Sequence, residues 1–280
     1  MVASYFQSTA FKIAVARSMY RLLKPITGKN KEVTRNGIRY ALDLSEGIDF
    51  SIWLRGNFQE YIFASKQFQL PENAVVMDVG ANVGAISLQF ARQIPQGKVW
   101  AFEPTDYALQ KLKTNLKLNP DLAGRIEVTQ TFISDQSEEN PELKAFSSWS
   151  LEKEEGDLHP VHLGTAKSAE GVGAISLDDF AQAQSIDRVD LIKIDTDGYE
   201  WEVLKGFEQG LQKYRPAVVF ECGLYLLKER GQRFEQFETF FKGLNYDLFE
   251  AKSGKSISSN SIEQIIPPQG TADILALPKS

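Results

Sequence analysis

The sequence has a single cysteine, Cys222, among its 280 residues. One cysteine cannot form an internal disulfide, and it excludes a zinc site built from several cysteines. Because chains without disulfides are typical of reducing compartments, we expect a cytoplasmic location. Cys222 itself is expected to be a small buried hydrophobic residue rather than a nucleophile.

Long uncharged apolar runs and a broad basic face are also missing. No apolar run approaches the ~20 residues that a membrane-spanning helix needs. The net charge is −6, and nucleic-acid binders are usually basic, so we expect no nucleic-acid partner.

Acidic residues are absent from residues 1–31, whereas six basic residues occur there. Apolar residues such as Phe6, Ile13 and Leu22 mix with these bases, which predicts an amphipathic helix that ends before Pro25. Residues 1–26 are therefore candidates for peripheral contact with an anionic membrane. The same composition suits an organelle transit segment, or a helix that docks on its own domain or on a second subunit.

Two segments follow this helix before the main domain begins. The segment KEVTRNGIRYALDLS predicts a hairpin, because Asn36-Gly37 is a strong two-residue turn signal. Residues 47–70 are rich in aromatic side chains and are expected to be helical. We assign residues 1–70 to an N-terminal extension and residues 71–280 to one larger domain.

Strands and helices alternate from residue 74 onward. Continuous apolar strands separated by helices predict a parallel sheet that is covered on both faces. An acidic, polar segment at 135–173, with nine acidic and three basic residues, interrupts the alternation and is expected to be an insertion. We expect strands at 74–79, 98–104, 126–134, 172–177, 189–195, 216–222, 246–251 and 272–278, and helices at 83–93, 106–118, 199–212 and 228–242, with another helix starting at 177.

Ligands of such sheets bind beyond the carboxyl ends of the strands. In this sequence those ends carry acidic and small residues: Asp78 to Gly84, Glu103-Pro104, Ser134-Asp135, Asp195 to Gly198, and Glu221 to Gly223.

The first strand end has the form D-x-G-x-x-x-G, with Asp78, Gly80 and Gly84. Asn82 occupies the position of the middle glycine of a dinucleotide fingerprint, so that fingerprint fails. An acid at this turn repels phosphate and favours a ligand with cationic groups. S-adenosylmethionine carries a sulfonium and an amino group. Glu103, 19 residues after Gly84, stands where a carboxylate accepts hydrogen bonds from the hydroxyls of a ribose.

Three motifs together resemble the FkbM-type S-adenosylmethionine-dependent methyltransferases. They are DVGANVG, AFEP and LIKIDTDGYEWEVLKGF, and the segment with Asn57, Phe58, Glu60 and Tyr61 is also similar. The resemblance runs from about Glu60 through Gly223.

The resemblance implies a class I methyltransferase fold, which is Rossmann-like and doubly wound, with a mostly parallel seven-stranded sheet. It implies methylation of a hydroxyl oxygen on a sugar, glycolipid, polyketide or other natural product. It places the cofactor's methionine end at the glycine turn and its adenine near Ser134 and Asp135, and adds Glu60 and Asp195 to the cofactor-binding residues. The sequence departs from the usual K-I-D-V-E-G-A-E block, with Thr196, Asp197 and Tyr199 in place of Val, Glu and Ala.

Methylation of a small-molecule hydroxyl requires the loss of its proton, so a base or a metal is needed near the oxygen. The candidate catalytic residues are Asp195, Glu200, Glu221 and His162. The presence of Glu200 also has a structural explanation, because the helix dipole favours an acid early in a helix. Glu221 could likewise be an acid at a strand end that is paired with a lysine. His162 is either a loop residue or a base on a lid. His159 lies three residues before it, but Pro160 disfavours a helical metal-binding pair, and we predict no metal site although a divalent metal is possible.

Two other functions are compatible with the sequence. Asp195-Thr196-Asp197 is a D-x-D, which in a glycosyltransferase would hold a divalent metal and a nucleotide diphosphate. That function leaves the glycine turn and Glu103 unexplained. A non-catalytic protein that binds S-adenosylmethionine is the other alternative, and it would show binding without turnover.

Overall fold

The structure is a computed structural model that describes residues 9–56, 58–63, 65, 67–139, 141, 143, 145–152 and 164–279. The chain begins with helix α2 (Thr9–Thr27), the hairpin β1 (Asn30–Arg35) and β2 (Ile38–Asp43), helix α3 (Gly47–Arg55) and the short 3-10 helix η1 (Glu60–Ile62). The predicted hairpin is confirmed: Asn36 and Gly37 have φ angles of 49° and 75°, the left-handed values that a tight hairpin turn needs.

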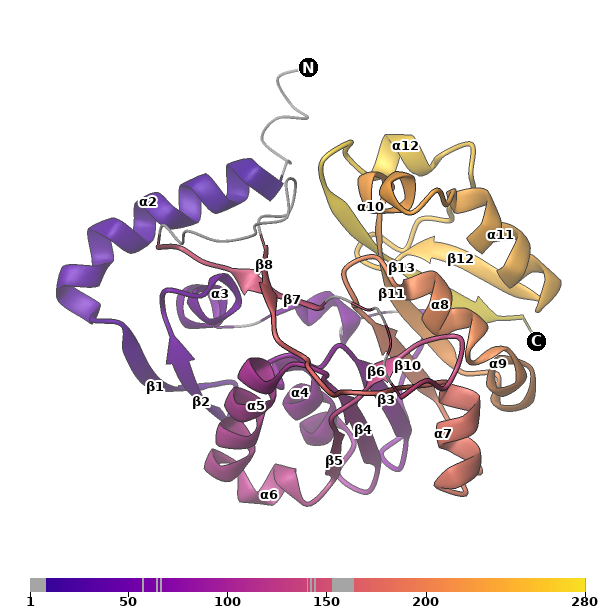
Figure 1. Ribbon diagram of the computed structural model, residues 1–280, viewed down its shortest axis with the longest axis horizontal. Helices are drawn as coiled ribbons and strands as arrows, with labels where there is room; N and C mark the ends of the chain where they lie inside the picture. Colours follow the sequence, from indigo (N-terminus) through magenta and orange to yellow (C-terminus); the bar gives the residue numbers. More distant parts are fainter. Residues whose placement is uncertain are drawn as a thin grey trace.

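A seven-stranded sheet forms the centre of the molecule (Figure 1). Its order is β12-β13-β11-β10-β3-β4-β5, and β13 is antiparallel to both of its neighbours while the other pairs are parallel. The predicted doubly wound, mostly parallel sheet is therefore confirmed. The strands are β3 (Val75–Val79), β4 (Lys98–Phe102), β5 (Ile126–Thr129), β10 (Leu191–Ile194), β11 (Ala217–Gly223), β12 (Tyr246–Glu250) and β13 (Thr271–Pro278).

Helices cover both faces of this sheet and enclose two hydrophobic cores. One core lies under α7 (Leu177–Ala183), α8 (Glu200–Lys205), α9 (Glu208–Tyr214) and α11 (Phe234–Gly243). The other lies under α4 (Ala85–Gln93) and α5 (Asp106–Leu118) and includes Tyr20, Ile38, Leu42 and Phe50 of the N-terminal segment. The N-terminal helix and hairpin thus share a core with the sheet. The remaining helices are α6 (Pro120–Ala123), α10 (Leu224–Glu229) and α12 (Ile262–Ile265).

Several predicted elements are shorter than the sequence pattern indicates. The described residues of 47–70 contain only α3 and η1, and Gly56 ends α3 in the left-handed conformation. The segment 199–212 contains α8 and α9, separated at Gly206, where an added Cβ would overlap the backbone of Ser134. The segment 228–242 likewise includes parts of α10 and α11, and the predicted strand 126–134 consists of β5 and β6 (Phe132–Ile133).

The end predicted for the N-terminal helix is wrong, because α2 continues through Pro25 to Thr27. A proline in the last turn removes only the hydrogen bond that its own N–H would make, and the helix ends two residues later.

The acidic insertion contributes strands to the surface beside α3. Within 135–173, β7 (Ala145–Trp149) and β8 (Gly164–Lys167) form an antiparallel pair. Directly after this segment, β9 (Ala174–Ile175) pairs with β6. Helix α2 is tied to this segment, since Arg17 donates to the Ser150 carbonyl at 3.0 Å and Tyr20 donates to Glu152 at 2.8 Å. His159 and His162 lie outside the described residues. No helix in the described part of the chain is long and apolar enough to cross a membrane.

Candidate active site

A cavity of about 460 Å³ opens at the carboxyl ends of β3, β4, β10 and β11. This size lies in the range of small-molecule sites. Strand-end residues line its floor, among them Gly80, Glu103, Asp195 and Glu221. Helices α2 and α3 supply the opposite, largely apolar wall, which includes Ile13, Met19, Ile48 and Leu54. The strand-end rule thus locates the cavity, and the N-terminal segment closes it.

The turn after β3 brings backbone to the edge of the cavity. Gly80, Asn82 and Gly84 have φ angles of 78°, 50° and 80°, so three residues of this turn are left-handed. The N–H groups of Gly80 and Ala81 both donate to the carbonyl of Phe102, at 3.0 and 2.9 Å. A Cβ on Gly80 would lie 2.9 Å from the carbonyl carbon of Asp195 and closer still to its oxygen. Glycine is therefore required at position 80 for β3 and β10 to meet here.

Asp78 supports this turn from behind. Its carboxylate is fully buried, accepts a hydrogen bond from Ser87 Oγ at 2.5 Å, and lies 3.5 Å from Lys193 Nζ. Asp78 does not line the cavity, and neither does Gly84, which begins α4 and faces Leu112. Both residues shape the turn through their neighbours.

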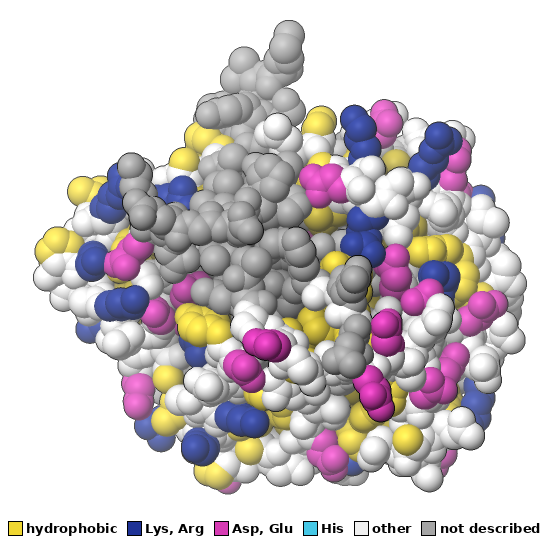
Figure 2. Space-filling view, viewed as in Figure 1, with side chains coloured by type: hydrophobic (Ala, Val, Ile, Leu, Met, Phe, Trp, Pro, Cys, Tyr) yellow, Lys and Arg dark blue, Asp and Glu magenta, His cyan; other side chains and the backbone are white. Residues whose placement is uncertain are grey.

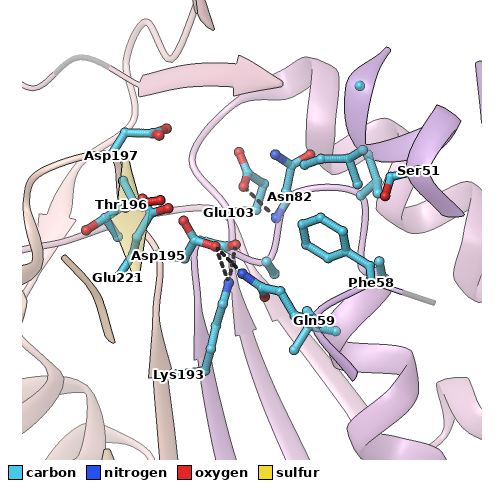
Figure 3. A pocket seen from close by; sticks show the side chains of 18 of the residues that line it. Ser51, Phe58, Gln59, Asn82, Glu103, Lys193, Asp195, Thr196, Asp197 and Glu221 are labelled. Atoms are coloured by element: carbon cyan, nitrogen blue, oxygen red, sulfur yellow. Dashed lines mark hydrogen bonds and ion pairs between the residues drawn. The ribbon is translucent and has the colours of Figure 1, made fainter. Parts of the chain in front are cut away.

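Lys193 joins two acids, Asp78 and Asp195, and Figure 3 shows its contact with Asp195. It is buried in the middle of β10, and Nζ lies 3.5 Å from Asp78 and 3.4 Å from Asp195, with a third contact of 3.3 Å to the Gly80 carbonyl. Burial alone would lower the pKa of Lys193, but Asp195, Asp78 and Asp273 outweigh it and raise the pKa above its usual value. Lys193 is therefore a permanent cation beneath the cavity.

Glu103 follows β4 and is almost fully buried at the cavity edge. One carboxylate oxygen accepts from Thr105 N and Oγ1 at 2.9 and 2.6 Å, and the other accepts from Asn82 N at 2.9 Å. Burial raises the pKa of Glu103, and these three hydrogen bonds oppose the rise. The oxygen that faces Asn82 has one partner and can accept a further donor.

Three more carboxyl groups converge beside Asp195. Glu221 on β11 and Asp197 in the loop after β10 line the cavity, and Asp273 lies opposite Glu221 in the β11–β13 register. The pKa values of Glu221 and Asp197 are raised well above their usual range. Burial is the largest cause, and repulsion from Asp195 is the second largest. The same two causes raise the pKa of Asp273 to about 7, although Tyr61 donates a hydrogen bond to it. The floor is thus rich in carboxyl groups that resist ionising together.

Glu200 has a different surrounding from these acids. It is buried and does not line the cavity, and its Oε1 accepts from Thr196 N at 2.9 Å, Thr196 Oγ1 at 3.0 Å and Gly198 N at 3.2 Å. Glu200 therefore holds the Asp195–Gly198 loop in shape.

The remaining sequence candidates lie outside the cavity lining. Asp135 is ion-paired with Lys205 at 2.6 Å, which lowers its pKa, and Ser134 donates to Asp135. Their neighbours Phe132 and Ile133 line the cavity instead. Glu60 begins η1 with an exposed side chain. No position can be given for His162, which falls in the part of the chain that is not described.

Lys193 and Gln59 are site residues that the sequence analysis missed. Gln59 Nε2 lies 3.4 Å from Asp195 Oδ2, and its Oε1 is buried without a hydrogen-bond partner among the described residues. Phe58, beside it, also faces the cavity (Figure 3). A lysine within the apolar run VDLIKID was a signal for Lys193, because a charge on a buried strand needs a partner. Gln59 had no such signal.

The described residues contain no group of three or more His, Cys, Asp or Glu side chains placed to hold a metal ion. Asp195 of the D-x-D is engaged by Lys193 and Gln59.

Comparison with known proteins gives one family match. Residues 78–248 match the Methyltransferase FkbM domain. Methyltransferase sdnD of Sordaria araneosa is 32% identical over 165 residues, which cover 50% of this chain and 62% of that protein. The hexuronic acid methyltransferase AglP of Haloferax volcanii is 27% identical over 157 residues, which cover 53% of this chain and 56% of that protein. The chain therefore spans less than two thirds of the length of these relatives.

A solved structure shares the fold. The methyltransferase FkbM of Methylobacillus flagellatus aligns with 80% of this chain and 49% of its own, with a TM-score of 0.50 and 16% identity.

Proposed function

The chain belongs to the FkbM methyltransferase family, and from this we propose that it transfers a methyl group from S-adenosylmethionine to a hydroxyl oxygen of a small-molecule acceptor. The observation that carries the proposal is the acidic floor beside a bare-backbone turn. Asp195, Asp197 and Glu221 face one cavity with Gly80 at its edge. Such a floor suits a ligand with sulfonium and ammonium groups, because opposite charges attract strongly in a poorly hydrated site.

The residues present fit this cofactor. Gly80 lets the turn pass directly against the backbone of Asp195 at the edge of the cavity, and the Glu103 oxygen beside Asn82 can accept from a ribose hydroxyl. The unpartnered Oε1 of Gln59 needs a donor, which an ammonium group provides. Apolar side chains of Phe132 and Ile133 offer a surface for a purine ring. We assign the methionine end to the turn and Asp195, and the ribose to Glu103.

When bound, S-adenosylmethionine supplies a methyl group that an oxygen nucleophile can take. The task of the protein is to bring the acceptor into line and to remove its proton. Glu221 is best suited to accept that proton. It lines the cavity, and its raised pKa makes it a stronger base than a solvated carboxylate once it is ionised. Asp195, which is paired with Lys193, is better suited to hold a cationic group.

In this proposal, Glu200 and Asp78 act by holding other residues in position. Glu200 fixes the loop that carries Asp195 and Asp197, and Asp78 fixes Lys193 and the turn. Tyr199 and Tyr225 also line the cavity. The ring of Tyr199 lies under the guanidinium of Arg230, 3.8 Å from it, so its side chain is held in place.

The experiment starts with isothermal titration of S-adenosylmethionine and S-adenosylhomocysteine, with NADH and UDP-glucose with manganese as controls. We expect micromolar binding of the adenosyl pair alone. Binding of UDP-glucose alone would favour the D-x-D function. Transfer of a labelled methyl group to a panel of sugars, uronic acids and glycolipids then identifies the acceptor class. Cofactor binding without transfer to any acceptor would favour a non-catalytic role.

A Glu221→Gln variant tests the base. We expect kcat to fall about a hundredfold, the usual contribution of a general base, while the Kd for S-adenosylmethionine changes much less than kcat, because Asp195 and Asp197 still face the cavity. Glu127→Gln on the exposed side of β5 is the matched control. An unchanged kcat would exclude Glu221 as the base.

A further inference from the structure

Exposed apolar side chains are confined to one region of the molecule. Among the described residues, the large hydrophobic side chains that are exposed are Val15, Leu22, Ile26 and Leu54, at 42%, 77%, 84% and 42%. Three belong to α2 and the fourth to α3. Scattered exposed hydrophobic residues are normal, but four in adjacent helices, with no others among the side chains that the structure describes, mark an interaction face.

The exposed apolar residues of α2 form one stripe. Val15, Leu22 and Ile26 are spaced at i, i+7 and i+11, and the half-buried Met19 at i+4 lies on the same side of the helix. The opposite side is fixed to the protein, since Ile13 and Tyr20 are each only 1% exposed and Arg17 and Tyr20 bond to the insertion. Helix α2 is therefore a docked platform with an outward apolar side.

The stripe begins inside the cavity and continues onto the surface. Val15 and Met19 line the cavity, and so does Leu54 of α3, whereas Leu22 and Ile26 lie beyond it along α2. The apolar wall of the cavity and the exposed stripe are thus one continuous surface. A ligand that enters here passes over apolar side chains before it reaches Glu221 and Asp195.

Positive charge accompanies this stripe. Helix α2 contains no acidic residue, although the whole chain has a net charge of −6. Arg17 and Lys24 are engaged by the Ser150 carbonyl and by Glu152 on the docked side, whereas Arg21 is exposed. Arg55, next to Leu54, is exposed at the cavity lining. Hydrophobic and basic side chains lie side by side over α2 at the left edge of the molecule (Figure 2). An apolar stripe flanked by bases is typical of a helix that lies in the plane of an anionic membrane surface.

We propose that α2 and the end of α3 dock on an anionic lipid bilayer, with the cavity opening toward it. A symmetric dimer through the same face is less favourable, because a twofold contact would bring the basic helix against its own copy. The proposed function adds a consequence that rests on it: the acceptor is an amphiphile whose apolar part stays in the bilayer while its hydroxylated head reaches Glu221.

Vesicle sedimentation of the full chain, without cofactor, tests the docking. We expect binding to vesicles that contain phosphatidylglycerol, weaker binding to pure phosphatidylcholine, and loss of binding as salt rises. The double variant Leu22→Asp with Ile26→Asp should bind at least about tenfold more weakly, because the stripe would no longer enter the lipid. Arg21→Glu should weaken binding to the anionic vesicles alone.

Lys117→Glu on α5 is the matched control, because it makes the same charge change at an exposed site away from α2. It should retain binding. Absent binding of the natural chain, or equal binding of the double variant, would overturn the proposal. A third result would also overturn it: light scattering shows a dimer of the natural chain that the double variant abolishes, and the natural chain does not bind vesicles.

Titration of the double variant with S-adenosylmethionine separates this proposal from the proposed function. Lost vesicle binding with an unchanged cofactor Kd supports docking. Vesicle binding in a chain that never binds the cofactor would refute the proposed function alone. Methyl transfer to soluble sugars but not to vesicle-borne glycolipids would refute the amphiphilic acceptor.

Discussion

The backbone carbonyl of Asp195 occupies the space that any side chain on Gly80 would need. The carbonyl carbon lies 2.9 Å from an ideal Cβ at that position, and the φ of Gly80 is 78°. The ends of β3 and β10 are therefore in backbone contact at the centre of the site, and position 80 has no tolerance for a larger residue.

Gly80→Ala is the first prediction. Left-handed strain and the clash with Asp195 should together lower the free energy of unfolding by roughly 2–4 kcal/mol, and S-adenosylmethionine binding should be lost. Gly28→Ala is the matched control, because Gly28 has a φ of 71° with no atom within 4 Å of an added Cβ. Urea unfolding and titration of both variants make the comparison. Equal losses in the two would show that conformation alone, and not the contact with Asp195, limits position 80.

Glu103→Gln is expected to weaken the binding of S-adenosylmethionine. Replacing a carboxylate acceptor by an amide removes a charge-assisted hydrogen bond, which is worth about 1.5–3 kcal/mol, or roughly ten- to a hundredfold in Kd. The Thr105 and Asn82 partners also lose an acceptor, so the melting temperature must be recorded beside the titration. A Kd equal to that of the natural chain in a folded Glu103→Gln protein would place the ribose elsewhere.

Lys193→Met should destabilise the protein. Removing one partner of a buried ion pair costs about 3–5 kcal/mol, because Asp78 and Asp195 would lose their cation. Urea unfolding measures this loss. Asp78→Asn added to Lys193→Met should recover part of it, and a double variant that is no more stable than Lys193→Met would contradict the assignment.

Asp273 should make stability fall as the pH rises toward neutral. Its pKa is about 7 in the folded protein, raised from 3.8, with burial as the main cause and Asp195 as the next. Between these two values the folded state holds a proton that the unfolded state has released, so raising the pH through this window removes stability. Below about pH 4 the contribution is complete, and above about pH 7 it is lost.

Asp273→Asn tests this linkage, because an amide cannot titrate but can still accept from Tyr61. The natural chain should lose more stability than the variant between pH 4 and pH 7 in parallel urea unfolding. Asp247→Asn, at an exposed position of the adjacent β12, is the control. Parallel stability curves for the natural chain and Asp273→Asn would show that Asp273 does not hold its proton into this range.

Much of the fold follows from local pattern. Continuous apolar strands, Asn36-Gly37 and the glycines after β3 each specify their structure through a few neighbouring residues, and the sheet and hairpin agree with them. The helix predicted at 199–212 is divided near Gly206, where a non-local contact restricts the residue type: the backbone of Ser134, from a distant segment, passes too close for a side chain. Sequence periodicity does not contain that contact.

Some residues of the candidate site can likewise be selected from the sequence, and others are revealed only by the tertiary structure. Gly80, Asn82, Glu103, Asp195 and Glu221 can be selected from sequence because they follow parallel strands, whose ends meet at one edge, and all five line the cavity. The sequence by itself therefore determines the family, the sheet and the strand ends at which the cavity opens. Only the tertiary structure decides that Asp78 and Glu200 brace the site from outside, that Lys193 and Gln59 converge on Asp195, and that α2 forms the apolar wall. Those relationships depend on side-chain direction and on segments more than a hundred residues apart, which neither periodicity nor motif spacing encodes.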